Sequence, residues 1–559
     1  MHKNSTIAEV FKLTSGQPLA DRESNRDRMA GSEVDVLVVG GGITGAGVAL
    51  DAATRGLSVA LVEMDDFASG TSSRSSKMIH GGFRYLQTGD VALVRESLRE
   101  RYRLQRNAPH LVSLLPFMIP LFLKGGFINP KLSRALGGAL WSYQFAGAWR
   151  LGKRHQRLSR DQVQAHMPSL DMNRIGGGYI FYDLRADDVR LTLAVLASAV
   201  ENGATILNYA SCDQISDFYD GGRVATINTD GNQFTVRARV IVNATGIWSD
   251  KFVQRSGLQT EQQLAPAKGA HLVVRSDALR NDVAVSIPIA SDKRTVSVVD
   301  AGHFSYIGST EANEPADINH PTVTDFDIDY ILTGLNKHLT TPLKACDLTG
   351  GWAGFRPLLA NDNKSRSSDL SRKHQISKDG EGFISVMGGK LTTYREMSEH
   401  TVDIVGEILG LKRPCMTRKL KLHGHYTSAS HIKGGERLEK RYGNRAALIK
   451  KMVSVDPALG QCVTPNDETL LAEIIWGLHA EMGCNLSDVL LRRTRVGLYD
   501  GRALLSNIDE ISSSIMDWTN WSAARRAIEL GKTKTVLRSE LGVLANHLPE
   551  PMNNETSKG

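Results

Sequence analysis

A strand, a glycine-rich turn, a helix and a second strand follow one another between Val34 and Glu63, and this stretch constrains the chain more than any other. Runs of β-branched and aliphatic residues at 34–39 and 59–62 are typical of strands that are buried on both faces. The turn at 40–45 has the glycine spacing G-x-G-x-x-G, and we expect it to open a helix over 46–55. The order of these elements predicts a nucleotide-binding βαβ unit.

Each part of this unit has a physical role. Gly40 permits a tight turn, Gly42 lets a pyrophosphate approach the backbone, and Gly45 lets the helix pack closely on the strand. The first turn of the helix presents free N–H groups to the phosphates. Glu63 lies about twenty residues beyond the glycines, where a carboxylate accepts hydrogen bonds from a ribose. Glu63 therefore favours FAD or NAD over NADP, and the motif does not choose between the first two.

Three later segments have the same small, polar character. The block at 70–86 is rich in glycine, serine and basic residues, the turn at 243–246 follows a strand expected over 240–242, and the segment at 388–395 opens a helix expected to run to about 409. Backbone N–H groups and hydroxyls in such turns suit an anionic cofactor. The cofactor contacts expected from these segments are Thr71, Ser72, Ser73, Ala244, Thr245, Gly246, Gly389, Lys390 and Leu391.

The remaining patterns predict an α/β protein of more than one domain. A helix over 189–202 and a strand over 205–209 form a second βαβ unit, alternating residues over 264–308 indicate a separate antiparallel sheet, and helical periods dominate beyond 412. We expect a Rossmann-like, discontinuous dinucleotide-binding domain over 33–410. An antiparallel substrate domain would be interleaved with it at about 90–180 and 255–345, and a helical C-terminal domain would span 411–559.

The first 32 residues are polar and lack the apolar core of a signal peptide, so we expect a disordered leader over 1–32, with Met29 as an alternative start. Five cysteines without a C-x-x-C pair indicate a reduced, cytosolic environment and no cysteine-based metal site. The net charge of +7 suits an anionic substrate or membrane surface, or reflects a mildly basic surface without a partner. No nucleic-acid-binding motif accompanies the charge.

The segment at 111–123 carries no charge, but Pro116 and Pro120 interrupt it, so it is too short and too broken to span a bilayer. An aromatic group at 141–149 follows it and leads into basic residues at 150–157. This combination is typical of a protein that lies on anionic lipid, and an ordinary core with a solvated basic edge is the alternative.

Together, these blocks resemble the FAD-dependent, membrane-associated glycerol-3-phosphate dehydrogenases. The most specific matches are His-Gly-Gly-Phe-Arg-Tyr at 80–85 and Gly-Gly-Lys-Leu-Thr-Thr-Tyr-Arg at 388–395. Lys-Gly-Ala-His at 268–271, Ile-Gly-Ser-Thr at 307–310 and Phe-Arg-Pro-Leu at 355–358 also match. The resemblance covers residues 33 to about 400, the tail resembles the C-terminal domain of the family, and the implied fold is an FAD domain of the glutathione-reductase or D-amino-acid-oxidase type.

The resemblance implies oxidation of sn-glycerol 3-phosphate to dihydroxyacetone phosphate, with hydride passing from C2 to flavin N5 and electrons passing on to a membrane quinone. A phosphate needs fixed cations, for which Arg84, Arg356 and Lys390 are the candidates. Neutral donors to the substrate would be Tyr85 and Thr392. No metal is required, because the flavin takes the electrons.

A histidine titrates in the right range to remove the hydroxyl proton, and His271 in the matching block is the expected base, with His80 as second choice. Two alternatives stay open. A glycerol-3-phosphate oxidase or related amine oxidase would use oxygen, and a non-catalytic flavin-binding scaffold would bind FAD without reacting. We expect a cytoplasmic protein, associated peripherally with the inner face of the cell membrane, and compatible with a homodimer.

Overall fold

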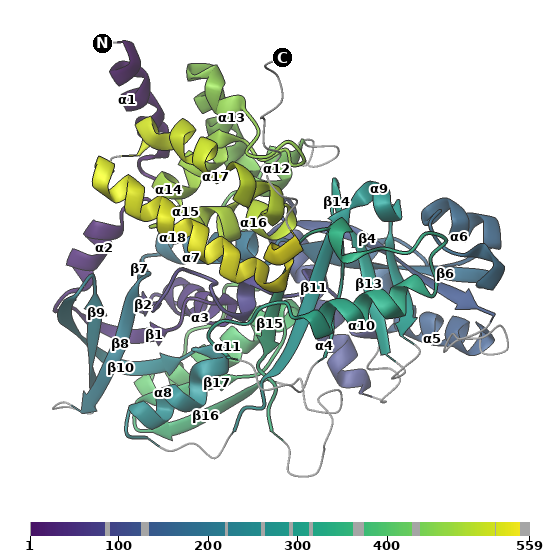
Figure 1. The fold of residues 1–559 in the computed structure, drawn as a ribbon. Helices are drawn as coiled ribbons and strands as arrows, with labels where there is room; N and C mark the ends of the chain where they lie inside the picture. The colour runs from purple at the N-terminus through teal and green to yellow at the C-terminus, as the bar shows by residue number, and fades with distance from the viewer. Residues whose placement is uncertain are drawn as a thin grey trace, which may run out of the picture.

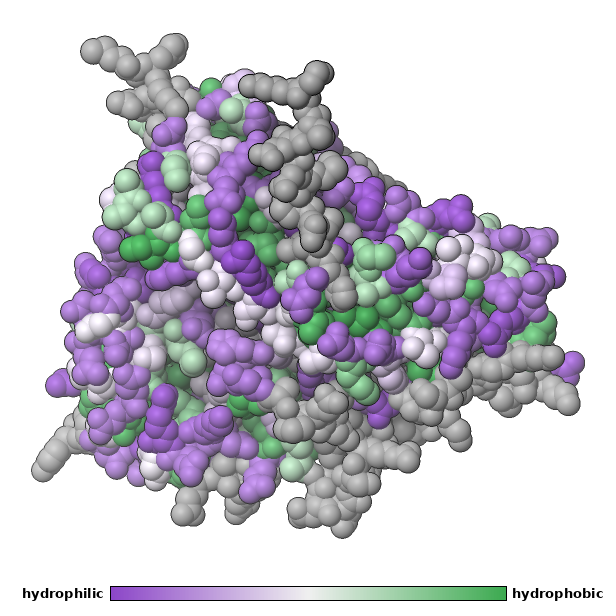
Figure 2. Space-filling model, viewed as in Figure 1, coloured by the Kyte–Doolittle hydropathy of each residue, from purple (hydrophilic) through white to green (hydrophobic). Residues whose placement is uncertain are grey.

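The computed structural model describes residues 2–83, 90–123, 133–217, 222–258, 263–289, 294–311, 317–360, 374–426, 436–519 and 521–547. Its strands form two sheets, one of eight strands and one of nine, and the C-terminal helices lie together beside them (Figure 1). The predicted α/β fold with a separate antiparallel sheet and a helical C-terminal region is confirmed. The face seen in Figure 2 is mainly hydrophilic, with hydrophobic residues gathered over the C-terminal helices and over the second sheet beside them.

The eight-stranded sheet carries the glycine-rich turn. Its parallel strands stand in the order β17, β10, β1, β2, β7, while β16 pairs antiparallel with β17 and the antiparallel β8–β9 hairpin pairs with β10. The bounds are β1 Glu33–Val39, β2 Val59–Val62, β7 Thr205–Leu207, β8 Ala210–Asp217, β9 Arg223–Thr229, β10 Asn232–Asn243, β16 Gln375–Gly380 and β17 Phe383–Met387.

Both faces of this sheet are covered, which explains the continuous apolar runs in its strands. Because side chains alternate along a strand, Val36 and Val38 pack against one layer of helices: α3 (Ile43–Thr54), α7 (Asp188–Glu201) and α11 (Tyr394–Leu409). Leu37 and Val62 point the other way, toward the β8–β9 hairpin and α8 (Ser249–Arg255). Helix α3 begins three residues earlier than expected, because Gly42 already serves as its N-cap in an extended conformation.

The nine-stranded sheet has the order β15, β11, β14, β13, β12, β4, β6, β3, with β5 paired to β6. Its neighbours are antiparallel except for β4 and β12. The bounds are β3 Met78–Ile79, β4 Val112–Phe122, β5 Gln156–Leu158, β6 Ile175–Ala186, β11 Ala267–Arg275, β12 Ala284–Ile289, β13 Arg294–Asp300, β14 Phe304–Gly308 and β15 Leu348–Arg356. The apolar segment at 111–123 is therefore a strand of this sheet.

The other helices lie around these sheets and in the C-terminal region. Among the described residues, no helix is both long and apolar enough to cross a bilayer. The bounds are α4 Val91–Asn107, α5 Ser133–Ala146, α6 Arg160–His166, α9 Ser276–Leu279, α10 Asp325–Asn336, α12 Arg437–Tyr442, α13 Ala446–Val455, α14 Leu471–Ala480, α15 Leu486–Asp488, α16 Val496–Tyr499, α17 Gly501–Ile515 and α18 Ala523–Leu541.

The expectation of a disordered leader is wrong for the described part of that segment. It forms α1 (His2–Thr14), which packs against α13 and α14, and α2 (Arg22–Met29), which packs against β7. Val10, Leu19 and Met29 are buried. The few apolar side chains of a polar segment are enough here, because distant elements provide the surface that covers them.

Candidate active site

A cavity of about 610 Å³ lies at the carboxyl ends of β1, β2 and β10 and reaches the start of the segment that opens α11. This volume is in the range that holds a cofactor. Most of the cofactor contacts expected from the sequence line it: Gly40, Gly42, Glu63, Thr71, Ser72, Ala244, Thr245, Gly246, Gly389, Lys390 and Leu391. The structure therefore brings together segments that are up to about 350 residues apart.

Two of the expected cofactor contacts are not among the lining residues. Gly45 lies beneath the turn, where a Cβ would come within 1.9 Å of the Gly40 carbonyl oxygen, so its role is the close packing of helix and strand. Ser73 is buried, and its hydroxyl donates to the Gly70 carbonyl at 3.2 Å. Each of these two residues thus packs against a glycine that lines the cavity, Gly40 or Gly70.

The turn and Glu63 are bound to each other. The Gly41 and Asp65 N–H groups donate to the Glu63 carboxylate at 2.6 and 3.0 Å. Burial raises the pKa of Glu63 to about 7, despite these two donors. Gly40 has a φ of +115°, and a Cβ there would lie 2.5 Å from the Ala244 carbonyl oxygen, so only glycine lets β1 and β10 end this close together.

Sequence reasoning missed one wall of the cavity. Ser211, Cys212 and Asp213 at the start of β8 face it together with Lys251 and Arg255 of α8. Arg255 donates to the Cys212 carbonyl at 2.7 Å, which joins α8 to the strand. No local motif marks these residues.

His271 of β11 is buried in the second sheet. Its Nε2 lies 3.0 Å from the Ser76 hydroxyl, and its ring stacks on Trp352, with centroids 4.8 Å apart. Burial, and then the charges of Lys77 and Arg356, hold the pKa of His271 well below its usual range. The imidazole is therefore held in its neutral form.

Arg356, at the end of β15, extends along the sheet toward His271. Gly269 and Gly354 lie opposite each other in register on β11 and β15, in the interval between the two residues. A Cβ on Gly269 would lie 2.9 Å from Nη2 of Arg356, so the guanidinium passes over this glycine. His271 and Arg356 lie on the same face of the sheet as these two glycines. The Arg356 guanidinium covers Gly269, and the Arg74 side chain covers Gly354, where a Cβ would lie 2.5 Å from the Arg74 Cβ.

Residues after β14 fix the orientation of Arg356. Its Nη2 donates to the Ser309 hydroxyl at 2.6 Å, and its Nη1 lies 3.2 Å from a Glu311 oxygen. Glu311 was not expected as a site residue, although the adjoining 307–310 match was a signal for this region.

Of the remaining expected residues, Lys390 and Thr392 belong to the segment that follows the cavity-lining Gly389. Lys390 lines the cavity and also affects Glu96 of α4, where burial raises the pKa of the carboxyl and the charge of Lys390 opposes that rise. Thr392 is buried and donates to the His80 carbonyl at 3.3 Å. Arg84 and Tyr85 lie outside the described residues.

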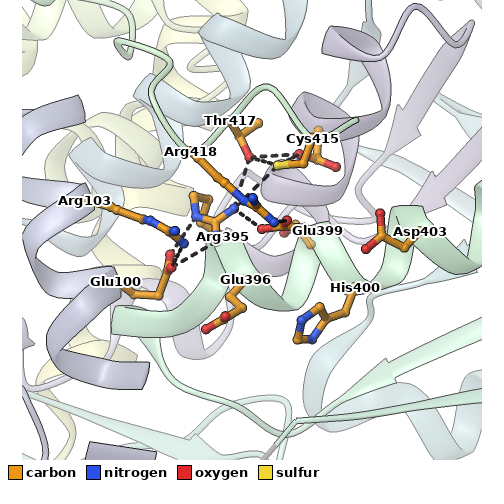
Figure 3. A network of polar contacts seen from close by, with 12 residues as sticks. Glu100, Arg103, Arg395, Glu396, Glu399, His400, Asp403, Cys415, Thr417 and Arg418 are labelled. Carbon is orange, nitrogen blue, oxygen red and sulfur yellow. Dashed lines mark hydrogen bonds and ion pairs between the residues drawn. The ribbon is translucent and has the colours of Figure 1, made fainter. Parts of the chain in front are cut away.

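A buried ion-pair network holds the helix that follows Lys390 (Figure 3). Arg395, in the first turn of α11, donates to Glu100 of α4 at 2.6 and 2.9 Å and to Glu399 at 2.6 Å. Arg418 pairs with the other oxygen of Glu399. The network joins α4 to α11 and so fixes the point from which the segment at 390–392 enters the site.

Comparisons with known proteins agree with this arrangement. A family model described as FAD dependent oxidoreductase matches residues 35–395, and one described as the C-terminal domain of alpha-glycerophosphate oxidase matches residues 408–526. A probable mitochondrial glycerol-3-phosphate dehydrogenase of Caenorhabditis elegans is 33% identical over 570 residues, covering 96% of this chain and 77% of that protein. Glycerol-3-phosphate dehydrogenase 2 of Mycobacterium tuberculosis is 35% identical, covering 88% of this chain and 86% of its own length.

A solved structure of the glycerol-3-phosphate dehydrogenase from Bacillus halodurans, complexed with FAD, superposes with a TM-score of 0.74 at 29% identity. The match covers 93% of this chain and 97% of that one. The fold and the cavity thus define an FAD-dependent oxidoreductase, which decides between the two cofactors that the glycine motif left open. Within that class, the chain belongs to the family of FAD-dependent glycerol-3-phosphate dehydrogenases.

Proposed function

We propose that the protein oxidises sn-glycerol 3-phosphate to dihydroxyacetone phosphate and passes the electrons to a membrane quinone. The single observation that carries the reaction is the shared face of β11 and β15, which holds a buried neutral His271 and an Arg356 that extends toward it over Gly269. A proton acceptor and an anion-binding cation on one face fit a substrate that carries a hydroxyl and a phosphate.

The residues of the cavity fit FAD. At one end it is lined by the glycine backbone, the start of α3 and Glu63, which suit a pyrophosphate and a ribose, and at the other end by Lys390 and Leu391. When bound, FAD accepts the two electrons that the substrate gives up as hydride from C2. The protein has to bind the phosphate, orient the C2–H bond and remove the hydroxyl proton.

Binding of the phosphate falls to the fixed cations. Arg356 offers paired N–H donors whose direction Ser309 and Glu311 set, and this geometry suits phosphate oxygens. Lys390 supplies a second charge from the cofactor side. Charges that are in place before the substrate arrives lower the cost of ordering it.

Removal of the proton falls to His271. With the Nε2 hydrogen directed to the Ser76 hydroxyl, Nδ1 keeps the lone pair, and among the described residues Nδ1 has no hydrogen-bond partner. Nδ1 therefore takes the proton of the C2 hydroxyl as hydride leaves the carbon. The stack on Trp352 keeps water from one face of the ring.

The test is anaerobic addition of sn-glycerol 3-phosphate to the purified holoenzyme. Oxidised flavin absorbs at roughly 450 nm, and we expect this absorbance to bleach with substrate, to recover rapidly with a quinone and to recover slowly with air. Rapid recovery in air with peroxide formation would support the oxidase alternative instead. A bound flavin that no polyol phosphate bleaches would support the non-catalytic scaffold.

A patch on α5 and the turn after it supports delivery of electrons to a membrane. Trp141, Phe145 and Trp149 are 47%, 77% and 59% exposed, and the rings of Trp141 and Phe145 stack. Exposed basic residues follow at Arg150, Lys153, Arg154 and Arg157. Aromatic rings beside cations suit the headgroup region of an anionic bilayer, which is where a quinone pool would be reached.

A further inference from the structure

One carboxylate clamps the segment that touches the proposed base. Asp188, at the start of α7, is fully buried and accepts from both the backbone N–H and the hydroxyl of Ser75, at 3.1 and 2.7 Å. The ammonium of Lys77 donates to the same carboxylate at 3.2 Å. Asp188 thus fixes the residues on either side of Ser76.

The clamped segment places a hydroxyl on His271. Ser76 Oγ lies 3.0 Å from Nε2 of His271, and the Ser76 carbonyl accepts from the Tyr306 hydroxyl at 2.9 Å. The serine side chain is short, so the position of its hydroxyl is set largely by the position of its backbone. The position of the Ser76 hydroxyl, and with it the orientation of the imidazole, therefore depends on the clamp.

Lys77 makes a second connection to the same histidine. Its Nζ lies 4.5 Å from the centroid of the Trp352 ring, and Trp352 stacks on His271. The attraction between the Lys77 ammonium and the face of the indole stabilises the position of the Trp352 ring. Asp188 therefore supports two of the groups that contact the base, the hydroxyl at Nε2 and the indole at its face.

The clamp itself is completed by the C-terminal helical region. Arg495, which is 1% exposed and immediately precedes α16, donates to Asp188 at 2.6 Å and to the Ser73 carbonyl at 2.7 Å. The Asp188–Arg495 pair spans 307 residues of sequence. The guanidinium holds the carboxylate and the start of the clamped segment at once.

We propose that Asp188 and Arg495 are positioning residues for His271, so that docking of the C-terminal helical region completes the geometry of the proton acceptor. Both residues act on His271 through the segment 75–77 that they hold. The inference rests on the proposed function, in which His271 removes the hydroxyl proton, and it assigns to the C-terminal region a part in the chemistry beyond stability.

The test compares flavin reduction in anaerobic stopped-flow experiments on holoenzymes of the wild type, Arg495→Lys and Asp188→Asn. Arg495→Lys keeps the charge but loses the planar guanidinium, whose Nη2 donates to both Asp188 and Ser73 while its Nη1 donates to the Leu491 carbonyl at 3.3 Å. We expect the limiting reduction rate to fall about 10- to 100-fold, with the half-saturating substrate concentration within about threefold, because misplacing a catalytic group slows the step it performs. Asp188→Asn should change the same parameter in the same direction.

Arg190→Lys is the matched control. Arg190 also forms a buried pair across the same boundary, a bidentate one with Glu481 at 2.6 and 2.7 Å, and makes no bond to Ser75, Ser76 or Lys77 among the described contacts. We expect this variant to lower the thermal unfolding temperature as Arg495→Lys does, while its limiting reduction rate stays within about twofold of wild type. Only a positioning role separates the two variants in this way.

The outcomes distinguish this inference from the proposed function. Absence of bleaching in the wild type would overturn the proposed function, and an unchanged rate in His271→Asn would overturn the role of the base. If the wild type bleaches and His271→Asn is slow, a wild-type rate in Arg495→Lys, or an equal loss in Arg190→Lys, would overturn the positioning role. Should Arg495→Lys not fold, Ser75→Ala removes the 2.7 Å bond to Asp188 and the 3.0 Å bond from the Lys77 N–H, both within the clamped segment, and a wild-type rate in that variant would reject the clamp.

Discussion

The imidazole of His271 stacks on the indole of Trp352, with ring centroids 4.8 Å apart and planes inclined by 14°. The two residues lie opposite each other in register on β11 and β15. The indole covers one face of the imidazole, while burial removes the water that would stabilise its charged form. A histidine held in this way is a base that starts each turnover neutral.

We expect His271→Asn to lower the limiting rate of flavin reduction by about 10²- to 10⁴-fold, because that is the usual contribution of a general base. The apparent substrate affinity should change little, since the Asn side chain fills much of the space that the imidazole occupies. Stopped-flow reduction by sn-glycerol 3-phosphate measures both quantities. His338→Asn is the control, because His338 is equally buried but bonds the Pro288 carbonyl at 3.1 Å, away from the site. A loss of less than threefold in His271→Asn would remove it as the base.

The pH dependence of reduction should respond to Lys77. Burial, then Lys77, then Arg356 lower the pKa of His271, so in the wild type the rate should be lost only when the pH falls well below 6.5. Lys77→Met removes one of these positive charges, which lets the pKa of His271 rise. The acid limb of the rate profile should therefore move to higher pH.

The control for this shift in the acid limb follows from the groups that surround His271. Ser76 precedes Lys77, Tyr306 comes from β14, and Arg356 comes from the same strand as Trp352. The carboxylate of Asp188 lies beyond Lys77 and pairs with it. Lys77→Arg keeps the charge and should leave the acid limb in place. An unmoved limb in Lys77→Met would show that Lys77 does not influence the base.

Arg356→Ala should raise KM for sn-glycerol 3-phosphate by an order of magnitude or more, because a charged hydrogen bond to a buried anion contributes about 1.5–3 kcal/mol. The KM of Arg356→Lys should lie between those of the wild type and Arg356→Ala, since lysine retains the charge without the paired donors. Steady-state assays with a soluble quinone analogue give KM and kcat separately. An unchanged KM in Arg356→Ala would exclude Arg356 from substrate binding.

The dinucleotide-binding unit could be predicted from the sequence because its signals are local. The apolar runs of β1 and β2, the glycine spacing and Glu63 lie within thirty residues, roughly the length of one βαβ unit. The turns at 244–246 and 389–391 were found in the same way, and they do line the cavity. The early start of α3 was missed because Gly45 and Gly47 are poor helix formers in isolation, and packing overrides that propensity.

The clamp at Asp188 and the packing of the N-terminal segment could not be predicted, because they depend on contacts between residues far apart in the sequence. Lys77 and Asp188 are 111 residues apart, and Asp188 and Arg495 are 307 apart, so no window of sequence contains both partners. The burial of Val10 on the C-terminal helices escapes sequence reasoning for the same reason. Such residues are ordinary polar or apolar positions until the fold brings them together.

The buried pair of Glu100 and Arg395 should matter more for stability than the exposed end of the same network (Figure 3). Glu100 is 1% exposed, and Glu100→Gln leaves the buried Arg395 guanidinium with one of its two carboxylate partners, Glu399, so we expect a loss of up to about 3–5 kcal/mol in the free energy of unfolding. Arg418→Ala removes a pair whose arginine side chain is 56% exposed, worth about 0–1 kcal/mol. Thermal unfolding of the holoenzymes should show a clearly lower midpoint for Glu100→Gln alone. Equal midpoints would contradict the ranking.

Membrane binding should depend on the aromatic patch of Trp141, Phe145 and Trp149. A triple change to serine removes the exposed rings and leaves the adjacent basic residues in place. We expect binding to vesicles with about a third anionic lipid to fall at least tenfold in a sedimentation assay, because each ring contributes apolar area to the interface. Reduction of flavin by substrate in solution should be unchanged, since the patch lies on α5 and the turn after it, and none of its residues lines the cavity.

Phe326→Ser is the matched control, because Phe326 is a similarly exposed aromatic residue, at 45%, on α10. It should leave vesicle binding as in the wild type. Raising the salt concentration should weaken binding of the wild type, as basic residues next to the patch attract anionic headgroups within a Debye length of about 8–10 Å. Wild-type binding by the triple variant would mean that another surface meets the bilayer, and the path of electrons to a quinone would then have to begin there.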